Sequence, residues 1–317
     1  MTARSIQDAN RAPTTERAVS PSVWSQLWSR NAGGYLFLLP WFLGFFGLTL
    51  GPMISSLYLS FTNFDLLTAP DWVGPANYVR IFTADPKFST SMRVTLFFVV
   101  FSVPLKLAFA LGVALLLNRG MKGLPLYRAV FYLPSLLGAS VAIAVLWRQL
   151  FAGDGVVNDA LAIFGIKGPA WISNPNYSLW TLVVLSVWQF GSPMIIFLAG
   201  LRQIPVDMYE AASLDGASKW RQFWKITLPL LTPVVFFNFI IQTIEAFKSF
   251  TPAFIISGGT GNPINSTLFY TLYLYQEAFS FFRMGYASAL AWILLAIVGF
   301  FTAFSFLTSK YWVHYDD

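Results

Sequence analysis

The sequence contains no cysteine and a single histidine, His314, among its 317 residues. The lack of cysteine excludes disulfides, thiolate metal sites and cysteine nucleophiles. A lone histidine close to the C-terminus argues against a metal centre or a histidine-dependent catalytic triad. Charged residues make up only 11% of the chain, against about 25% in a soluble domain. The Gly-x-x-x-x-Gly-Lys-Ser/Thr loop that holds ATP phosphates in many ATPases is also absent from the sequence.

Apolar residues dominate instead, at 56% of the chain, against about 45–50% in a soluble domain. We predict an all-α membrane protein, because apolar runs of about 20 residues cross a bilayer as helices. Six transmembrane helices are predicted, at residues 35–60, 94–117, 126–150, 178–201, 230–256 and 286–309. Several of these runs contain proline, so kinked or broken helices are expected.

The distribution of lysine and arginine predicts how these spans are oriented, because positive residues collect on the cytoplasmic side. With a cytoplasmic N-terminus, twelve fall on inner segments: Arg4, Arg11, Arg17, Arg30, Arg119, Lys122, Arg128, Arg202, Lys219, Arg221, Lys225 and Lys310. Six fall on outer segments: Arg80, Lys87, Arg93, Arg148, Lys167 and Arg283. Both termini are therefore expected in the cytoplasm.

Three regions follow from this orientation. Residues 1–34 are expected to form a cytoplasmic tail with a short helix, which is either interfacial or an extension of the first span. Residues 35–309 form the six-helix transmembrane domain, and residues 310–317 form a cytoplasmic C-terminal tail. The net charge of +6 is explained by the orientation of a membrane protein, so no nucleic-acid partner is expected.

The connection between the fourth and fifth spans, about residues 202–229, is polar and predicts a cytoplasmic helix–turn–helix. Asp207 followed by Glu210 has the spacing of a capping box at a helix start. Gly216 would end that helix in the left-handed conformation. Ser218 would then cap a second short helix, and Pro229 would open the next span. A polar helix–turn–helix that projects from a membrane domain has the form of a docking element.

The fifth predicted span carries a polar stripe. Asn238, Gln242, Glu245 and Ser249 follow one another at i, i+4, i+7 and i+11, which places them on one helical face. Lys248 lies three residues after Glu245 and can pair with it. Charged groups at membrane depth are costly, so they face a protein interior or a water-filled path. The amides, carboxylate and hydroxyl suit a sugar, although a polar seam between helices would look the same.

Two residues of the fourth span, Gln189 and Ser192, are further candidates for the same path because they lie beside Pro193. Lys106, in the second span, is expected to snorkel or to pair, and no role is assigned to it. The glycine-rich run at 257–263 lacks the Gly-Lys-Ser/Thr of a phosphate loop. A phosphate-binding role for that run is therefore rejected.

The polar loop resembles the Glu-Ala-Ala loop of ABC importer permeases, in which a glycine and an Ile-x-Leu-Pro sequence follow at fixed spacing. All seven positions match: Glu210, Ala211, Ala212, Gly216, Ile226, Leu228 and Pro229. The run from Phe254 to Ala289 and the early Val73-Gly74 and Asn77-Tyr78 pairs are similar to sugar permeases of the maltose-importer type. Together the resemblance covers most of residues 35–309.

The resemblance implies a permease subunit of a bacterial inner membrane importer, multi-pass, with its cytoplasmic helix seated in an ATPase. The implied coupling residues are Asp207, Glu210, Ala211, Ala212, Asp215 and Gly216. The implied partners are a second permease, of a related but distinct chain, an ATPase dimer, a periplasmic solute-binding protein, the sugar and membrane lipid. ATP and Mg would bind the ATPase, so this chain would be non-catalytic and would carry no cofactor itself.

The resemblance favours a carbohydrate substrate carried by alternating access, and an alginate-like acidic oligosaccharide is the most specific expectation. A glycerol-phosphate ester and a neutral maltose-like sugar remain open. An ion-coupled secondary transporter that titrates Glu245 and Lys248 is the main alternative, although it leaves the cytoplasmic loop unexplained. A membrane enzyme acting on lipid-linked sugars is a second alternative, but the sequence offers no acidic or histidine cluster for it.

Overall fold

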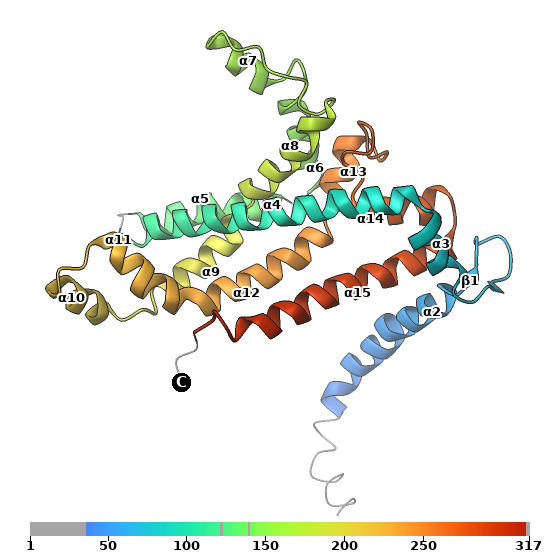
Figure 1. The fold of residues 1–317 in the computed structure, drawn as a ribbon, viewed down its shortest axis with the longest axis horizontal. Coiled ribbons are helices and arrows are strands. Elements are labelled where there is room, and N and C mark those ends of the chain that lie inside the picture. The colour runs from blue at the N-terminus through green and yellow to red at the C-terminus, as the bar shows by residue number, and fades with distance from the viewer. Residues whose placement is uncertain (1–35, 121–122, 139, 315–317) are drawn as a thin grey trace, which may run out of the picture. The chain divides into compact units, whose positions relative to one another are not determined.

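The computed structural model describes residues 36–120, 123–138 and 140–314 (Figure 1). It divides the chain into two compact units, which meet between Ser55 and Ser56. The described part of the first unit, residues 36–55, is helical. Its helix runs from Leu36 to Leu59 and contains a π-helical turn, η1 (Phe45–Leu50), followed by α2 (Gly51–Leu59). This helix agrees with the first predicted span. The predicted tail and short helix at residues 1–34 lie outside the described residues.

The second unit is almost wholly helical. A short antiparallel pair, β1 (Thr62–Asn63) and β2 (Asp71–Trp72), comes first. The helices of its first half are α3 (Ala76–Ala84), α4 (Pro86–Leu117), α5 (Leu124–Leu137), α6 (Val141–Leu150), α7 (Val156–Ile163) and α8 (Pro175–Trp188). Those of its second half are α9 (Gly191–Leu201), α10 (Val206–Leu214), α11 (Lys219–Gln222), η2 (Phe223–Thr227), α12 (Leu228–Phe247), α13 (Thr251–Ser257), α14 (Tyr270–Tyr275), η3 (Gln276–Ser280) and α15 (Met284–Ser309).

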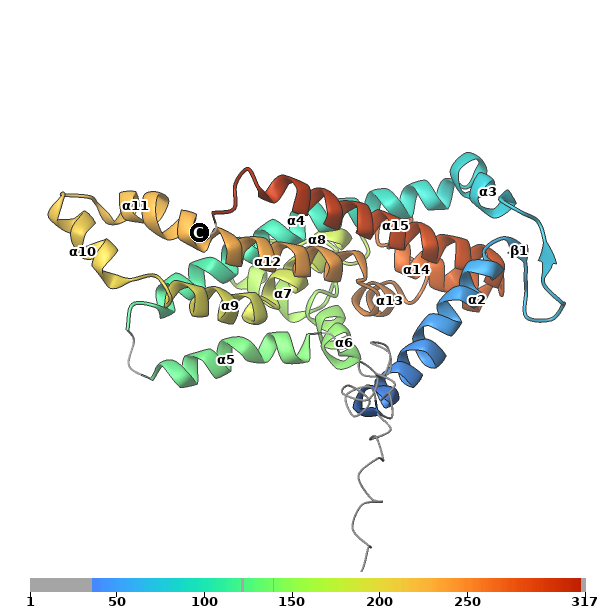
Figure 2. The same cartoon turned by 90° about the horizontal axis from the view of Figure 1, so that it is seen from below.

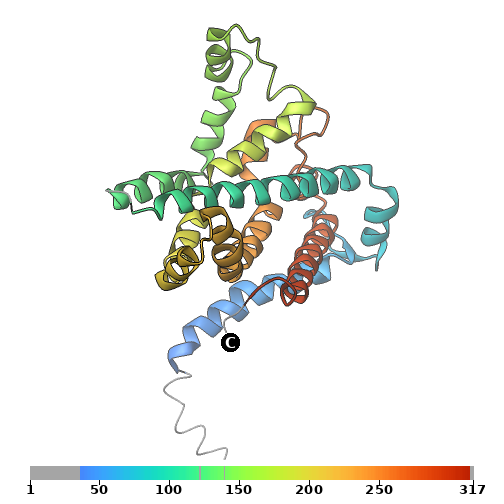
Figure 3. The ribbon, with the colours of Figure 1, turned by 60° about the vertical axis from the view of Figure 1, so that its left-hand side comes forward.

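The long helix α4 is the centre of this unit. It begins sharply because the Asp85 carboxylate accepts hydrogen bonds from the backbone N–H groups of Lys87 and Phe88, at 2.9 and 3.1 Å. It packs against α8, α9, α12 and α14, and Ala110 and Ala114 are fully buried on it, which lets neighbouring backbones approach closely. Figure 3 shows α12 and α15 lying below α4 in that view.

Two predicted spans are each divided into two helices. The third consists of α5 and α6 and the fourth of α8 and α9, and each pair is bent by more than 40°. Ser140 starts α6 by accepting a hydrogen bond from the Ile143 N–H, at 3.3 Å. Four helical stretches of the described residues are long and apolar enough to span a membrane, and one of them runs from Lys219 to Ser257 through α11, η2, α12 and α13. Six spans result only if each bent pair crosses once. The count of six therefore stays a prediction.

The fifth predicted span is also interrupted, which the sequence reading missed. Helix α12 ends at Phe247 and α13 begins at Thr251. Pro252 has no N–H to donate to the carbonyl of Lys248 four residues earlier, so the helical ladder stops there. Ser249 consequently lies beyond the end of α12, and its predicted place at i+11 on a continuous helix is wrong.

The two ends of the second unit carry different elements. The hairpin of α10 and α11 lies at the end where α4 finishes, together with the end of α15 (Figures 1 and 2). The start of α4, α3 and the start of α15 lie at the opposite end. Helix α15 agrees with the sixth predicted span to within two residues at its start, Met284 against residue 286.

Candidate functional site

A cavity of about 380 Å³ lies where α4, α5, α9 and the break after α12 converge. Six of the seven residues predicted to line a path face it: Gln189, Ser192, Gln242, Glu245, Lys248 and Ser249. Ser249 reaches the cavity from the break between α12 and α13 rather than from a helical stripe. Apolar walls come from Phe98, Val103 and Leu185, among others.

Asn238 is the predicted path residue that does not line this cavity. Its side chain is fully buried, at 0% exposure, and neither amide atom has a hydrogen-bond partner among the described residues. It lies one helical turn before Gln242, but that turn of α12 is enclosed by protein. The polar stripe is therefore divided between a cavity wall and the protein interior, and the cavity gives Asn238 no path role.

Ser135 and Gln189 hold the bent helices together at the cavity. The Ser135 hydroxyl donates to the carbonyl of Gln189 and accepts from the backbone N–H of Ser192, each at 2.9 Å. The Gln189 side-chain amide donates to the carbonyl of Gly138 at 3.0 Å. Ser135 and Gly138 also line the cavity, and sequence reasoning missed both. A serine within an apolar run was the available signal, but its spacing does not identify a partner 54 residues away.

Glu245 and Lys248 form the ion pair that their spacing predicts. The Lys248 Nζ lies 2.8 Å from the Glu245 Oε1. Both side chains are more than half exposed, Lys248 at 56% and Glu245 at 60%. Lys106 of α4, to which the sequence reading gave no role, lines the same cavity. These are the charged residues among those that line it.

Helix α10 begins differently from the prediction. Pro205 occupies the cap position and no side chain caps the helix, so Asp207 lies inside the first turn and the predicted capping box is wrong. Pro205 itself fixes an extended backbone that leads into the helix. The acidic Asp207 still lies where it complements the positive end of the helix dipole.

The end of α10 and the start of α11 follow the prediction. Gly216 has φ +77°, and the N–H of Ala217 donates to the carbonyl of Ala212 at 2.9 Å, which closes a Schellman motif. Ser218 caps α11 by accepting from the Arg221 N–H at 3.3 Å. The connection is thus a helical hairpin whose turn is closed by backbone and side-chain hydrogen bonds.

Three side-chain hydrogen bonds fasten this hairpin to itself and to the start of α12. The buried Gln222 donates from its side-chain amide to the Ser213 hydroxyl at 2.9 Å and to the Ala217 carbonyl at 3.1 Å. The hydroxyls of Tyr209 and Thr227 are hydrogen bonded at 2.9 Å.

Glu210, Ala211 and Asp215 remain exposed, whereas Ala212 is half-buried. Leu214 and Trp220 are also exposed, at 90% and 71%. Exposed apolar side chains that lie together are typical of a protein interaction surface.

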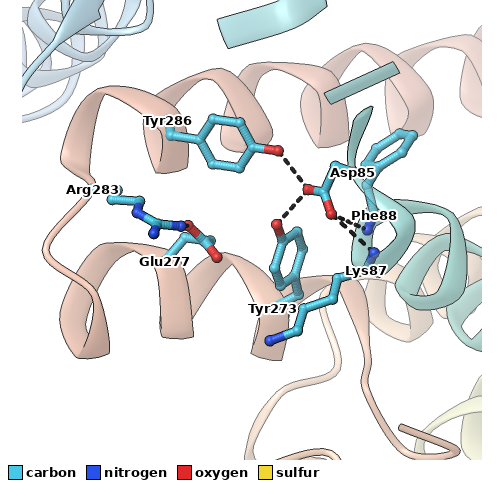
Figure 4. A network of polar contacts seen from close by, with 7 residues as sticks. All are labelled: Asp85, Lys87, Phe88, Tyr273, Glu277, Arg283 and Tyr286. Atoms are coloured by element: carbon cyan, nitrogen blue, oxygen red, sulfur yellow. Dashed lines mark hydrogen bonds and ion pairs between the residues drawn. The ribbon is translucent and has the colours of Figure 1, made fainter. Parts of the chain in front are cut away.

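A polar network stands at the opposite end of the unit (Figure 4). One oxygen of Asp85 accepts from the hydroxyls of Tyr273 and Tyr286, while the other holds the start of α4. Arg283 and Glu277 form an ion pair at 3.2 Å. Burial raises the pKa of Asp85, but the hydrogen bonds from Tyr273, Tyr286 and the start of α4 outweigh it, so that pKa lies below its usual value. Sequence reasoning missed the network.

Residues 94–310 match the model of a protein family described as binding-protein-dependent transport system inner membrane component. The chain belongs to this family. It is therefore a multi-pass inner membrane permease, and the predicted resemblance to ABC importer permeases is confirmed.

Relatives along almost the whole permease support the same assignment. It is 54% identical over 288 residues to the probable ABC transporter permease protein YesP of Bacillus subtilis (strain 168), covering 90% of this chain and 93% of YesP. It is 32% identical to the lactose transport system permease protein LacF of Rhizobium radiobacter, covering 88% of this chain and 95% of LacF. These matches favour the importer over the ion-coupled alternative.

Solved structures agree on the fold. The permease superimposes on a chain of a bacterial alginate ABC transporter in complex with a pentasaccharide-bound periplasmic protein, with a TM-score of 0.78. The two are 20% identical, and the match covers 92% of this chain and 98% of the other. At this identity the likeness shows a shared fold.

Replacing Gly216 by valine is expected to loosen the hairpin of α10 and α11. A left-handed backbone costs a residue with a side chain about 1–2 kcal/mol, whereas nothing within 4 Å would touch the added Cβ itself. Gly216→Asn is the matched control, because asparagine tolerates this conformation. Limited proteolysis at the α10–α11 connection of the detergent-solubilised permease, without the ATPase subunits, measures the effect. Equal cleavage of the two variants would contradict it.

Proposed function

We propose that this permease imports a sugar or oligosaccharide in an ATP-driven assembly. The observation that carries the proposal is the cavity at the crossing of α4, α9 and α12. Gln189, Gln242 and several serines supply hydrogen-bond donors and acceptors for sugar hydroxyls, and aromatic and aliphatic walls suit the apolar faces of sugar rings. Relatives named for lactose, and for arabinooligosaccharides in Bacillus subtilis, support the substrate class.

The partners in this proposal are a second, related permease, two ATPase subunits and a soluble binding protein in the periplasm. ATP and Mg bind the ATPases, and this chain hydrolyses nothing. Six spans cross the inner membrane, with each bent pair crossing once and both termini in the cytoplasm. Supporting this orientation, the hairpin of α10 and α11 and the end of α15 lie at one end of the second unit (Figure 2).

The exposed face of α10 is proposed to seat in an ATPase and to transmit its movement. The hairpin is fastened to α12 through Tyr209 and Thr227, and Gln222 keeps α10 and α11 together. Helix α12 carries Gln242 and Glu245 into the cavity wall. A displacement of α10 therefore moves the cavity wall directly, which is what alternating access about a central site requires.

Vesicles that contain the complete importer test this function. Uptake of labelled oligosaccharides is expected when ATP is enclosed with the ATPase subunits, and it should fall to background with a non-hydrolysable ATP analogue. A proton or sodium gradient in place of ATP should give no uptake, since this chain contributes no ion-coupled step. Accumulation driven by such a gradient alone would refute the proposal.

A further inference from the structure

The cavity contains one positive charge more than its own residues neutralise. Lys106, Lys248 and Glu245 are the charged residues that line it. Glu245 forms an ion pair with Lys248, whose Nζ lies 2.8 Å from its Oε1. Lys106 makes no ion pair or hydrogen bond with any residue that the structure describes. Two cations against one carboxylate leave a local charge of +1.

The position of Lys106 carries a free-energy cost, because its charged side chain lies within an apolar helix. It lies near the middle of α4, the 32-residue apolar helix at the centre of the unit, two residues after Pro104. It is half-buried, on the helical face that also carries Val103 to the cavity. A charged side chain within a spanning helix costs about 2.5 kcal/mol or more, and helix packing alone would be served equally well by a neutral residue. Such a cost is characteristic of a functional group that meets an opposite charge.

We propose that Lys106 binds a carboxylate of the transported sugar, so that this permease selects sugars that place one uronic acid in the cavity. The proposal rests on the sugar-importing function given above. It adds the charge of the substrate and the residue that binds that charge. The amides and hydroxyls of the cavity hold the neutral part of the ligand. The ammonium of Lys106 meets the carboxylate, and the cavity becomes neutral when it is occupied.

The size of the unbalanced charge favours a carboxylate over a phosphate. One carboxylate brings one negative charge to the cavity, which matches the single unpaired ammonium. A phosphate monoester brings about −1.5 to −2 at neutral pH, which would leave the occupied cavity negative beside Glu245.

Direct binding to the assembled importer, without its binding protein, tests the proposal independently of transport. The probes are the methyl glycosides of galacturonate, mannuronate and guluronate, which carry one carboxylate each, together with their methyl esters, which have the same rings without the charge. Ligand-observed NMR measures Kd for each. For at least one of the three, the acid is expected to bind about tenfold tighter than its ester.

The variants then assign that preference to Lys106. Lys106→Gln is expected to abolish the tenfold preference while leaving the affinity for the ester unchanged, and Lys106→Arg should restore it. Lys310→Gln removes an exposed lysine at the end of α15 and should have no effect. Gel filtration of each complex verifies that the variants assemble.

Several outcomes overturn the proposal. They are equal binding of acids and esters, no binding of any acid, an equal loss of acid and ester in Lys106→Gln, and tighter binding of a sugar phosphate than of every uronate. ATP-driven uptake is measured in parallel on the same preparations. If no sugar is taken up while Lys106 still selects acids in the binding assay, the importing function has failed and the charge assignment has not.

Discussion

Replacement of Glu210 by alanine is expected to lower ATP-driven uptake and ligand-stimulated ATP hydrolysis together, by about 30-fold or more. Glu210 is exposed on α10 and makes no ion pair within the described ranges, so its carboxylate is free for a basic group of the ATPase. Truncating one partner of a buried interfacial charge pair costs about 2 kcal/mol or more, which is about 30-fold. Alanine also favours the helix, so α10 itself should persist.

The measurement uses vesicles that contain the complete importer, with uptake and ATP hydrolysis followed on the same preparation. Glu210→Lys should be more severe than Glu210→Ala, because it adds repulsion to the lost pair. Asp154→Ala is the matched control, since it removes an exposed acid between α6 and α7, outside the hairpin. Full stimulation of ATP hydrolysis in the Glu210 variants would show that α10 is not the coupling element.

Local signals in the sequence predicted the hairpin of α10 and α11 almost completely. Gly216 and Ser218 act through their own backbone and their nearest neighbours, so a short stretch of sequence contains the whole cause of the turn. Helix α15 was predicted to within two residues at its start because an uninterrupted apolar run has clear limits. The error at Asp207 was also local: Pro205, two residues earlier, already supplied the extended entry to the helix.

The features of the site that the sequence did not predict depend on contacts between residues far apart in the chain. Whether Asn238 or Gln242 faces the cavity depends on which helices enclose each turn of α12, and both positions share the same spacing pattern. Ser135 joins Gln189 across 54 residues, and Tyr286 reaches Asp85 across 201. No periodicity encodes such partners. Lys106 gained significance only when α4 placed it beside Glu245 and Lys248 in one cavity.

Asp85→Ala is expected to destabilise the permease more than any other single change to an acidic side chain. Asp85 caps α4, and loss of such a cap costs about 1 kcal/mol. The hydroxyls of Tyr273 and Tyr286, whose residues are 2% and 5% exposed, would both lose their acceptor, and each unsatisfied buried group costs about 1–3 kcal/mol. The start of α4 would then separate from α14 and α15, so the melting temperature of the detergent-solubilised complex should fall.

The ionisation of Asp85 adds a pH dependence whose sign is fixed. Its pKa is lowered in the folded protein, so its contribution to stability is complete above the unfolded value of about 3.9 and is lost as the pH falls through the folded value. Wild-type protein should therefore lose stability below about pH 4. Asp85→Asn, which keeps a capping oxygen but cannot ionise, should lose less over that range.

Matched variants separate this network from general acid sensitivity. Tyr273→Phe and Tyr286→Phe each remove one donor and leave the cap of α4 intact, so each should lower the melting temperature less than Asp85→Ala. Asp71→Ala removes an exposed acid of β2 and should leave it unchanged. Because the tyrosines and Asp85 share one carboxylate oxygen, the effect of Asp85→Ala combined with Tyr286→Phe should be smaller than the sum of the two. Full additivity would mean that Asp85 acts only as a helix cap, and that α15 is held by its apolar packing alone.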